Sequence, residues 1–136
     1  TGALEIKCYA VVDDVGTVIN PKIVAGQIQG GVVQGIGQVL GEHVKFDTDS
    51  AQLITGSFMD YHMPRAGDMP SISVASHPSP TPLNPLGVKG VGEAGTVGSL
   101  ACMHSAVLDA LSPLGVDWLD MPLTANKIWQ AISEAD

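Results

Sequence analysis

Apolar and polar residues alternate near the beginning of the chain. Every second position from 4 to 12 is apolar, at Leu4, Ile6, Cys8, Ala10 and Val12. A period of two is typical of a strand with one buried face. The pattern therefore predicts a half-buried strand over residues 4–12, which ends at the turn-like sequence Asp-Asp-Val-Gly of residues 13–16.

The next segment, about residues 21 to 45, has the spacing of an α-helix. Asn20 and Pro21 form a typical helix start, because Asn caps the first turn and Pro fits its first position. Apolar residues recur every three or four positions and predict one buried face, made of Ile28, Val32, Ile36, Val39 and Leu40. The same spacing predicts a helix from about Gly95 to Leu111 and a final helix over residues 125–133, capped by Thr124.

Shorter patterns lie between these helices. Residues 44–46 and 52–54 flank a polar turn and predict a hairpin, while residues 71–76 and 116–121 are further strand candidates. Residues 57–66 are predicted to form a short helix that ends before Pro64. The proline-rich residues 77–85 predict an extended loop. Together the patterns predict a single α+β domain over residues 1–136, with short, mostly antiparallel strands and three to four helices.

Composition narrows the class of protein. Fourteen acidic residues against six basic ones give a net charge of −8, which disfavours nucleic acid as a partner. No uninterrupted apolar run approaches the roughly 18 residues of a membrane span. The two distant cysteines, Cys8 and Cys102, are expected to be core residues in a reducing compartment, and no signal peptide is recognisable, so we expect a cytoplasmic location. A start without Met suggests a piece of a longer polypeptide or a trimmed chain.

The chain contains 16 glycines, and they are concentrated in two segments. The first is the predicted helix, which contains Gly26, Gly30, Gly31, Gly35 and Gly37. Five interior glycines destabilise a helix by roughly 3–5 kcal/mol in total, so something must compensate for them. Gly26, Gly30 and Gly37 share one side of the helix. Their pattern leaves two interpretations open, close packing of another helix or close approach of a ligand, in which Gln27 would be placed to donate a hydrogen bond.

The second glycine-rich segment spans residues 87–98. Residues 90–95, Gly-Val-Gly-Glu-Ala-Gly, match the dinucleotide pattern G-x-G-x-x-G, but that interpretation requires a strand directly before it, and here a proline-rich loop precedes it. The loop leads instead into a helix start, where free N–H groups favour negative charge. Glu93 either caps this helix or acts as a general base toward a ligand. The four histidines show no paired spacing for a zinc site.

Several longer motifs carry a resemblance to a known family. They are Asp-Val-Gly-Thr-Val-Ile-Asn-Pro at 14–21, Gly-Gln-Ile-Gln-Gly-Gly at 26–31, Gln-Gly-Ile-Gly at 34–37, Thr-Gly-Ser-Phe-Met-Asp-Tyr at 55–61, Met-Pro-Arg-Ala at 63–66 and Asn-Pro-Leu-Gly-Val-Lys-Gly-Val-Gly-Glu-Ala-Gly-Thr at 84–96. In this order they resemble the C-terminal part of the molybdopterin-binding large subunit of the xanthine oxidase family. Carbon monoxide dehydrogenase and aerobic aldehyde dehydrogenase large chains are the most similar members. The resemblance extends from about residue 10 to residue 132.

The resemblance implies a second cofactor-binding lobe for a molybdenum pyranopterin, usually the cytosine dinucleotide form in bacteria. It implies that Glu93 is the base that deprotonates a water-derived ligand, close to molybdenum without being a firm ligand of the metal. Gln27 would hydrogen-bond the metal-oxygen end of the cofactor. Gly26, Gly30 and Gly31 would let the helix approach the cofactor closely, and Gly92 and Gly95 would leave room for the cofactor beside Glu93. With the family in view, a catalytic role for Glu93 is favoured over capping.

The resemblance also implies partners outside these residues. They are the upstream part of the large subunit, an iron–sulfur subunit and a flavin subunit, in an oligomer of such heterotrimers. The substrate stays open among carbon monoxide, aldehydes and N-heterocycles, because relatives that use each of them share similar C-terminal motifs. Two other classes of function also stay open, a packing domain that binds no cofactor on its own and a nicotinamide-binding module built around Gly90.

Overall fold

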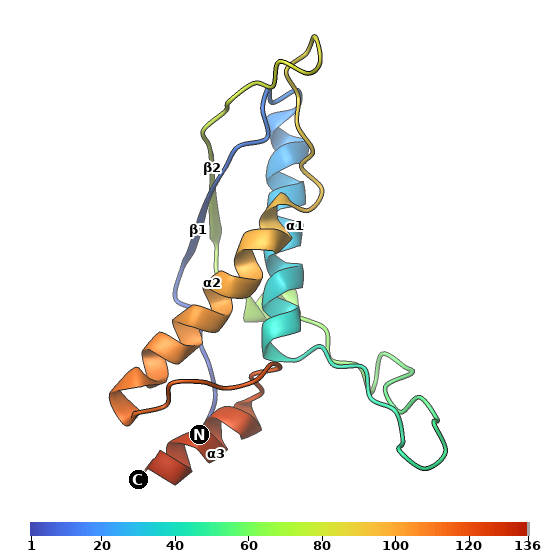
Figure 1. The fold of residues 1–136 in the computed structure, drawn as a ribbon, viewed down its shortest axis with the longest axis vertical. Helices are drawn as coiled ribbons and strands as arrows, with labels where there is room; N and C mark the ends of the chain where they lie inside the picture. Colours follow the sequence, from blue (N-terminus) through green and yellow to red (C-terminus); the bar gives the residue numbers. More distant parts are fainter. Residues whose placement is uncertain (136) are drawn as a thin grey trace.

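The computed structural model describes residues 1–135, and these contain three α-helices, two short 3-10 helices and one two-stranded sheet (Figure 1). In chain order the elements are β1 (Tyr9–Asp13), α1 (Pro21–Leu40), η1 (Ala66–Asp68), β2 (Ile72–Ser76), α2 (Ala94–Leu111), η2 (Ser112–Leu114) and α3 (Ala125–Ala135). The α+β class and the three helices that the sequence predicts are therefore confirmed.

Helix α1 begins where the sequence predicts. The Asn20 side chain accepts a hydrogen bond from the Ile23 backbone N–H at 3.2 Å, and Pro21 occupies the first turn. The helix ends at Leu40, several residues before the expected end. The Gly37 carbonyl there accepts hydrogen bonds from the N–H groups of both Gly41 and Glu42, each at 2.9 Å. These bonds satisfy the end of the helix before the chain turns away.

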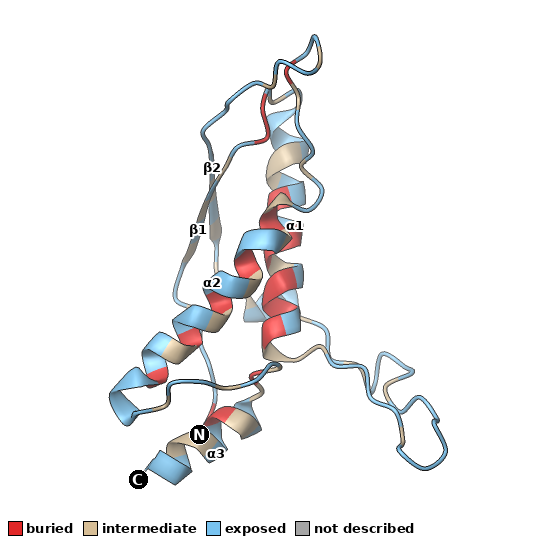
Figure 2. Ribbon diagram, in the orientation of Figure 1, coloured by how far each residue is buried: buried red, intermediate tan, exposed pale blue. Residues whose placement is uncertain are grey.

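Helices α1 and α2 form the centre of the core. The predicted face of α1 is buried at Ile28, Val32, Ile36 and Val39, while Leu40 is half-buried. Helix α2 adds Met103, Val107 and Leu111, and Leu123 and Ile128 close the core beside α3. Figure 2 shows buried segments on α1 and α2, with a smaller buried part at the beginning of α3.

The two strands are parallel, and the expectation of antiparallel strands was wrong. Tyr9 pairs with Ile72 at one end of the sheet and Asp13 pairs with Ser76 at the other. Helix α1 lies between β1 and β2 in the chain and brings it back to the end of the sheet where β1 begins. Two parallel strands require a crossover connection of this kind. The two antiparallel pairings are isolated bridges, Gly16 with Val88 and Phe46 with Leu53, and the latter closes the predicted hairpin.

Strand β1 is also shorter than predicted, and its faces are reversed. Tyr9, Val11 and Asp13 lie on the partly buried side, whereas Ala10 and Val12 are exposed. The sequence pattern treats Tyr9 as polar, although the residue packs against the core cluster. Cys8 and Cys102 are both exposed, so the expectation of two core cysteines was wrong as well.

Two other predicted elements are absent from the described residues. Residues 57–66 form turns in place of a short helix, and residues 116–121 form no strand. The Ser57 side chain accepts the Met59 N–H at 3.3 Å and donates to Asp60 at 2.5 Å, and these local bonds compete with a helical turn. At the C-terminal end, the Thr124 hydroxyl accepts from the Lys127 N–H at 3.3 Å, so the predicted cap of α3 is confirmed.

Helix α2 with the turn after it, residues 94–114, is long and apolar enough to cross a membrane, with a mean hydropathy of 1.2. The sequence, which contains no uninterrupted apolar run of that length, did not suggest such a segment. The criterion measures length and composition alone, and core helices of many proteins meet it. In this fold one side of α2 is buried against α1.

Candidate functional site

The glycines of α1 fall into two groups, and the first group packs against α2. A Cβ added to Gly31 would lie 3.0 Å from the backbone nitrogen of Thr96, and one added to Gly35 would overlap the Ser99 side chain. From the other helix, a Cβ on Gly95 would overlap the Ile28 carbonyl oxygen. Close helix packing is therefore the reason for these three glycines.

The second group, Gly26 and Gly30, faces open space. No described atom lies within 4 Å of a Cβ added at either position. The two residues line a shallow groove between α1 and the segment that leads into β2. Gly37, which the sequence grouped with them, is buried, and a Cβ there would lie 2.8 Å from the Pro64 side chain. The surface that a ligand can reach is thus formed by Gly26 and Gly30 without Gly37.

Glu93 occupies the position immediately before α2. Its backbone carbonyl accepts a hydrogen bond from the Val97 N–H at 3.1 Å, but within the described residues its side chain makes no capping hydrogen bond. The residue is exposed, and a Cβ on the neighbouring Gly92 would meet no described atom within 4 Å. This geometry does not support the capping interpretation and leaves the carboxylate available to a ligand.

The packing of the two helices determines where Glu93 lies relative to α1. Gly95 of α2 contacts α1 at Ile28 and Val32, and Ser99, one turn later, contacts α1 at Gly35. Later residues of α2 thus meet later residues of α1, so the two helices run in the same direction. Glu93 precedes Gly95 and therefore lies toward the N-terminal half of α1, which also carries Gln27 and Gly26 (Figure 1). Gln27 is exposed on that half. Glu93 and Gly92 are exposed at the beginning of α2, and Gly26, Gln27 and Gly30 are exposed on α1. Gly26 and Gly30 line the groove toward β2, whereas α2 packs on another face of α1 through Gly31 and Gly35.

Asp14 joins three segments next to this surface. One of its carboxylate oxygens accepts the backbone N–H groups of Gly16 and Ser79, each at 2.9 Å, and the other accepts from the Lys89 ammonium at 2.6 Å. The hydrogen bond from Lys89 is the largest cause of a pKa lowered from 3.8 to about 2, and the two backbone bonds act in the same direction. Asp14 thereby attaches the loop that leads to Glu93 to the end of β1.

The same loop is closed by Asn84. Its side-chain oxygen accepts the Val88 N–H at 3.2 Å, and its amide nitrogen donates to the Val88 carbonyl at 3.0 Å. Gly87 has a φ of +67°, and Gly16, with a φ of +64°, has no room for a side chain beside the Gly87 carbonyl. Sequence reasoning missed the supporting roles of Asp14, Asn84 and Lys89. The signal in the sequence was an Asp or Asn close to glycine or proline, as at Asp14 and Asn84, because such side chains often bond to the backbone of a turn.

The family model of the molybdopterin cofactor-binding domain matches residues 1–70 of the chain, about half of its length. The chain belongs to this family. It is 37% identical to the carbon monoxide dehydrogenase large chain of Hydrogenophaga pseudoflava, over 98% of this chain and 17% of that relative. It is 40% identical to the nicotine 6-hydroxylase large subunit of Paenarthrobacter nicotinovorans, over 96% of this chain and 16% of that relative.

A solved structure of reconstituted carbon monoxide dehydrogenase from Oligotropha carboxidovorans matches the fold of this molybdopterin cofactor-binding domain. Its TM-score is 0.92 at 32% identity, over 99% of this chain and 17% of the other chain. The resemblance to xanthine oxidase family large subunits is thus confirmed. The domain spans about a sixth of the length of the curated relatives it matches.

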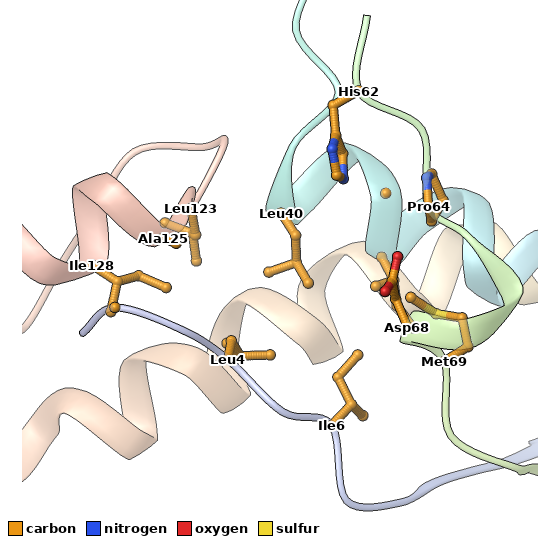
Figure 3. Close-up of a pocket in the computed structure, with 13 residues that line it drawn as sticks. Leu4, Ile6, Leu40, His62, Pro64, Asp68, Met69, Leu123, Ala125 and Ile128 are labelled. Atoms are coloured by element: carbon orange, nitrogen blue, oxygen red, sulfur yellow. The ribbon is translucent and has the colours of Figure 1, made fainter. Parts of the chain in front are cut away.

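A half-open pocket of about 260 Å³ lies elsewhere in the molybdopterin cofactor-binding domain (Figure 3). Apolar side chains from the N-terminal segment, the end of α1 and the beginning of α3 line it, among them Ile6, Leu40 and Ile128. The polar side chains of His62 and Asp68 also face it. None of the five predicted site residues contributes to its lining. The candidate site residues therefore lie outside this pocket.

The described part of the domain contains no group of three His, Cys, Asp or Glu side chains able to hold a metal ion. A metal at this site would need ligands from outside these residues. The nicotinamide interpretation also lacks its structural context, since β2 ends at Ser76 and only an isolated antiparallel bridge at Val88 lies near Gly90.

Proposed function

We propose that this chain is the second cofactor-binding lobe of a molybdenum-dependent hydroxylase or dehydrogenase large subunit, with Glu93 as its general base. One observation carries the proposal. The Glu93 carboxylate makes no capping bond within the described residues, and the helix behind it is packed on α1 through Gly95. A base needs this combination of a free carboxylate and a rigid support.

The open glycines fit a large, flat cofactor. Because Gly26, Gly30 and Gly92 carry no side chains and border open space, their backbone is accessible to a ring system. Gln27, exposed beside Gly26, offers two amide N–H groups to an acceptor on the cofactor. These four residues would hold a molybdenum pyranopterin, for which we propose the cytosine dinucleotide form. When bound, the cofactor supplies the two-electron oxidation that protein side chains cannot perform.

In this proposal the lobe contributes proton transfer and the positioning of the cofactor. A Glu93 carboxylate oxygen accepts the proton that water loses when its oxygen is transferred to the substrate. Gln27 would orient the bound cofactor by donating a hydrogen bond to it from its amide nitrogen. Asp14 and Asn84 hold the loop before Glu93, so the carboxylate stays in place between turnovers.

The complete protein has further parts. The matched relatives are named as large chains or large subunits, and one other relative is named as subunit gamma of a dehydrogenase complex. We propose that the upstream part of the large subunit completes the site and that an iron–sulfur and a flavin subunit carry the electrons away, in a cytoplasmic oligomer of heterotrimers. The names of the relatives point to carbon monoxide or nicotine, so the substrate is proposed only as a small molecule.

The test is Glu93→Gln in the complete enzyme. We expect turnover to fall by about 10²-fold or more, since general bases typically contribute 10²–10⁴-fold. The molybdenum content should be nearly unchanged. Glu134→Gln, at an exposed position on α3, is the matched control and should behave like the wild type. Turnover is measured on carbon monoxide, aldehydes and N-heterocycles, and wild-type rates in Glu93→Gln would refute the base.

The exposed apolar side chains favour a second candidate, a packing lobe without a catalytic group. Leu83, Leu86 and Val97 lie near the site and are 65% exposed or more. Such a lobe would only shield a cofactor held by other parts of the subunit. It predicts the opposite outcome of the same experiment, because Glu93→Gln would then leave turnover unchanged.

A further inference from the structure

Residues 41–65 form an arm that extends from the C-terminal end of α1, away from the helices (Figure 1). Its first part is the hairpin closed by the bridge between Phe46 and Leu53. Its second part is a tight turn at residues 57–60. None of the described residues between 41 and 65 is buried, and Figure 2 shows the whole arm as exposed or intermediate. The arm therefore contributes nothing to the core of this domain.

Internal hydrogen bonds nevertheless hold the arm in one shape. The hairpin is closed by bonds from the Asp47 N–H to the Gln52 carbonyl at 2.8 Å and from the Ile54 N–H to the Lys45 carbonyl at 2.9 Å. At its base, the Tyr61 hydroxyl donates to Glu42 at 2.8 Å, a bond that raises the pKa of Tyr61. The segment is ordered before it meets any partner, which lowers the entropy cost of docking.

The two ends of the arm differ in polarity. The hairpin end at residues 47–51 is polar, and the Asp47 carboxylate accepts hydrogen bonds from Asp49 and Ser50 there. The turn at 57–60 presents Phe58 and Met59, which are 86% and 93% exposed. Further exposed apolar residues lie along the arm at Val44, Phe46, Ile54 and Met63. An apolar patch of this kind on an ordered segment marks an interaction surface.

The match to carbon monoxide dehydrogenase shows that the arm has the same position in a much longer chain. The arm makes up about a fifth of the chain. If carbon monoxide dehydrogenase held the corresponding residues in a different position, the TM-score could not reach 0.92 over 99% of this chain. In a chain several times longer, the arm thus keeps a position outside the core of this domain. The matched residues are only 17% of that chain, so most of the polypeptide that could hold the arm lies outside the match.

We infer that the apolar turn of the arm, at Phe58 and Met59, docks on the part of the large-subunit polypeptide that precedes this lobe. The inference rests on the proposed function insofar as this chain is the C-terminal lobe of such a subunit. The polar hairpin end stays outside the contact. The arm thereby connects the two halves of the cofactor site at a distance from the cofactor.

The experiment is photocrosslinking in the intact enzyme with its partner subunits. Phe58→p-benzoylphenylalanine places the reactive group at the apolar turn, and Thr48→p-benzoylphenylalanine places it at the polar hairpin end as the matched control. After irradiation, peptide mass spectrometry identifies the attached residues. From position 58 we expect an intrachain product that joins the arm to a peptide preceding the lobe, and from position 48 we expect no protein crosslink.

Two results would overturn the inference. Attachment of position 58 to a different polypeptide would mean that a second copy or a partner subunit covers the arm. Absence of any crosslink from position 58 would mean that nothing covers it. The readout requires neither molybdenum nor turnover. A failure here is therefore distinct from a failure of the proposed base, which the Glu93→Gln assay detects.

Discussion

Gly30 and Gly31 are neighbours on α1, yet they have different reasons to be glycine. Gly31 is buried against the beginning of α2, and the Thr96 hydroxyl donates to its carbonyl at 3.0 Å. Gly30 is exposed beside an open groove, with no described atom near its missing side chain. The first glycine belongs to the packing of this domain, and the second is available to a ligand. A glycine-rich helix can thus combine two functions that its sequence does not separate.

Replacing each of these neighbours by valine tests that difference most severely. Gly31→Val forces a side chain against the Thr96 backbone and should lower the free energy of unfolding by about 3 kcal/mol or more, the upper range for overpacking. Gly30→Val should leave thermal unfolding of the complete enzyme nearly unchanged but reduce its molybdenum content, because the valine projects where the cofactor is proposed to lie. Equal molybdenum content in Gly30→Val and wild type would remove the ligand-facing role of this groove.

A milder pair makes the same comparison on α2. Gly95→Ala brings a Cβ into the Ile28 carbonyl and should destabilise the domain by about 1–3 kcal/mol. Gly98→Ala, one turn later, meets no described atom within 4 Å and should be neutral or stabilising by up to about 1 kcal/mol, since alanine is the better helix former. Denaturant unfolding of the complete enzyme measures both. Similar midpoints for the two variants would contradict the close crossing.

The smallest expected effect concerns the loop before Glu93. The Asp14 pKa is lowered in the folded protein, so its stabilising contribution is fully present above about pH 4 and is lost as the pH falls toward 2. The protection of the amides of residues 77–89 against hydrogen exchange, taken relative to the intrinsic rate at each pH, should fall over that interval. In Asp14→Asn this protection should already be lower at neutral pH and should not change over the same interval, with turnover reduced several-fold. An unchanged exchange profile in Asp14→Asn would show that other contacts hold the loop.

Local patterns in the sequence were sufficient for the helices. Asn20 with Pro21 marked the beginning of α1, and Thr124 marked that of α3, because caps depend on side chains within three residues. The turns at 57–60 were missed, since the Ser57 and Asp60 side chains compete with helical hydrogen bonds through short-range geometry that periodicity does not capture. Strand direction was missed because it depends on the path of α1 between β1 and β2.

The predicted site residues were found through motifs, and their supports were not. Glu93, Gln27 and the open glycines were named from the sequence, and the structure shows each of them exposed. Asp14 forms hydrogen bonds with Ser79 and Lys89, which are far from it in the sequence. Contacts between residues so far apart in the chain leave no local sequence pattern. Residues 44–54 of the arm were predicted as a hairpin, but the lack of burial along the arm became visible only in three dimensions.

By itself, the sequence determined the three helices, the family resemblance and the candidate base, because caps, helical periodicity and ordered motifs are local or contiguous along the chain. Only the tertiary structure decided which glycines serve packing and which remain open, and that the two strands are parallel. It also showed that the Glu93 side chain does not cap its helix. Each of these depends on which distant backbone atoms lie within a few ångströms, and that is set by the packing of α1 against α2.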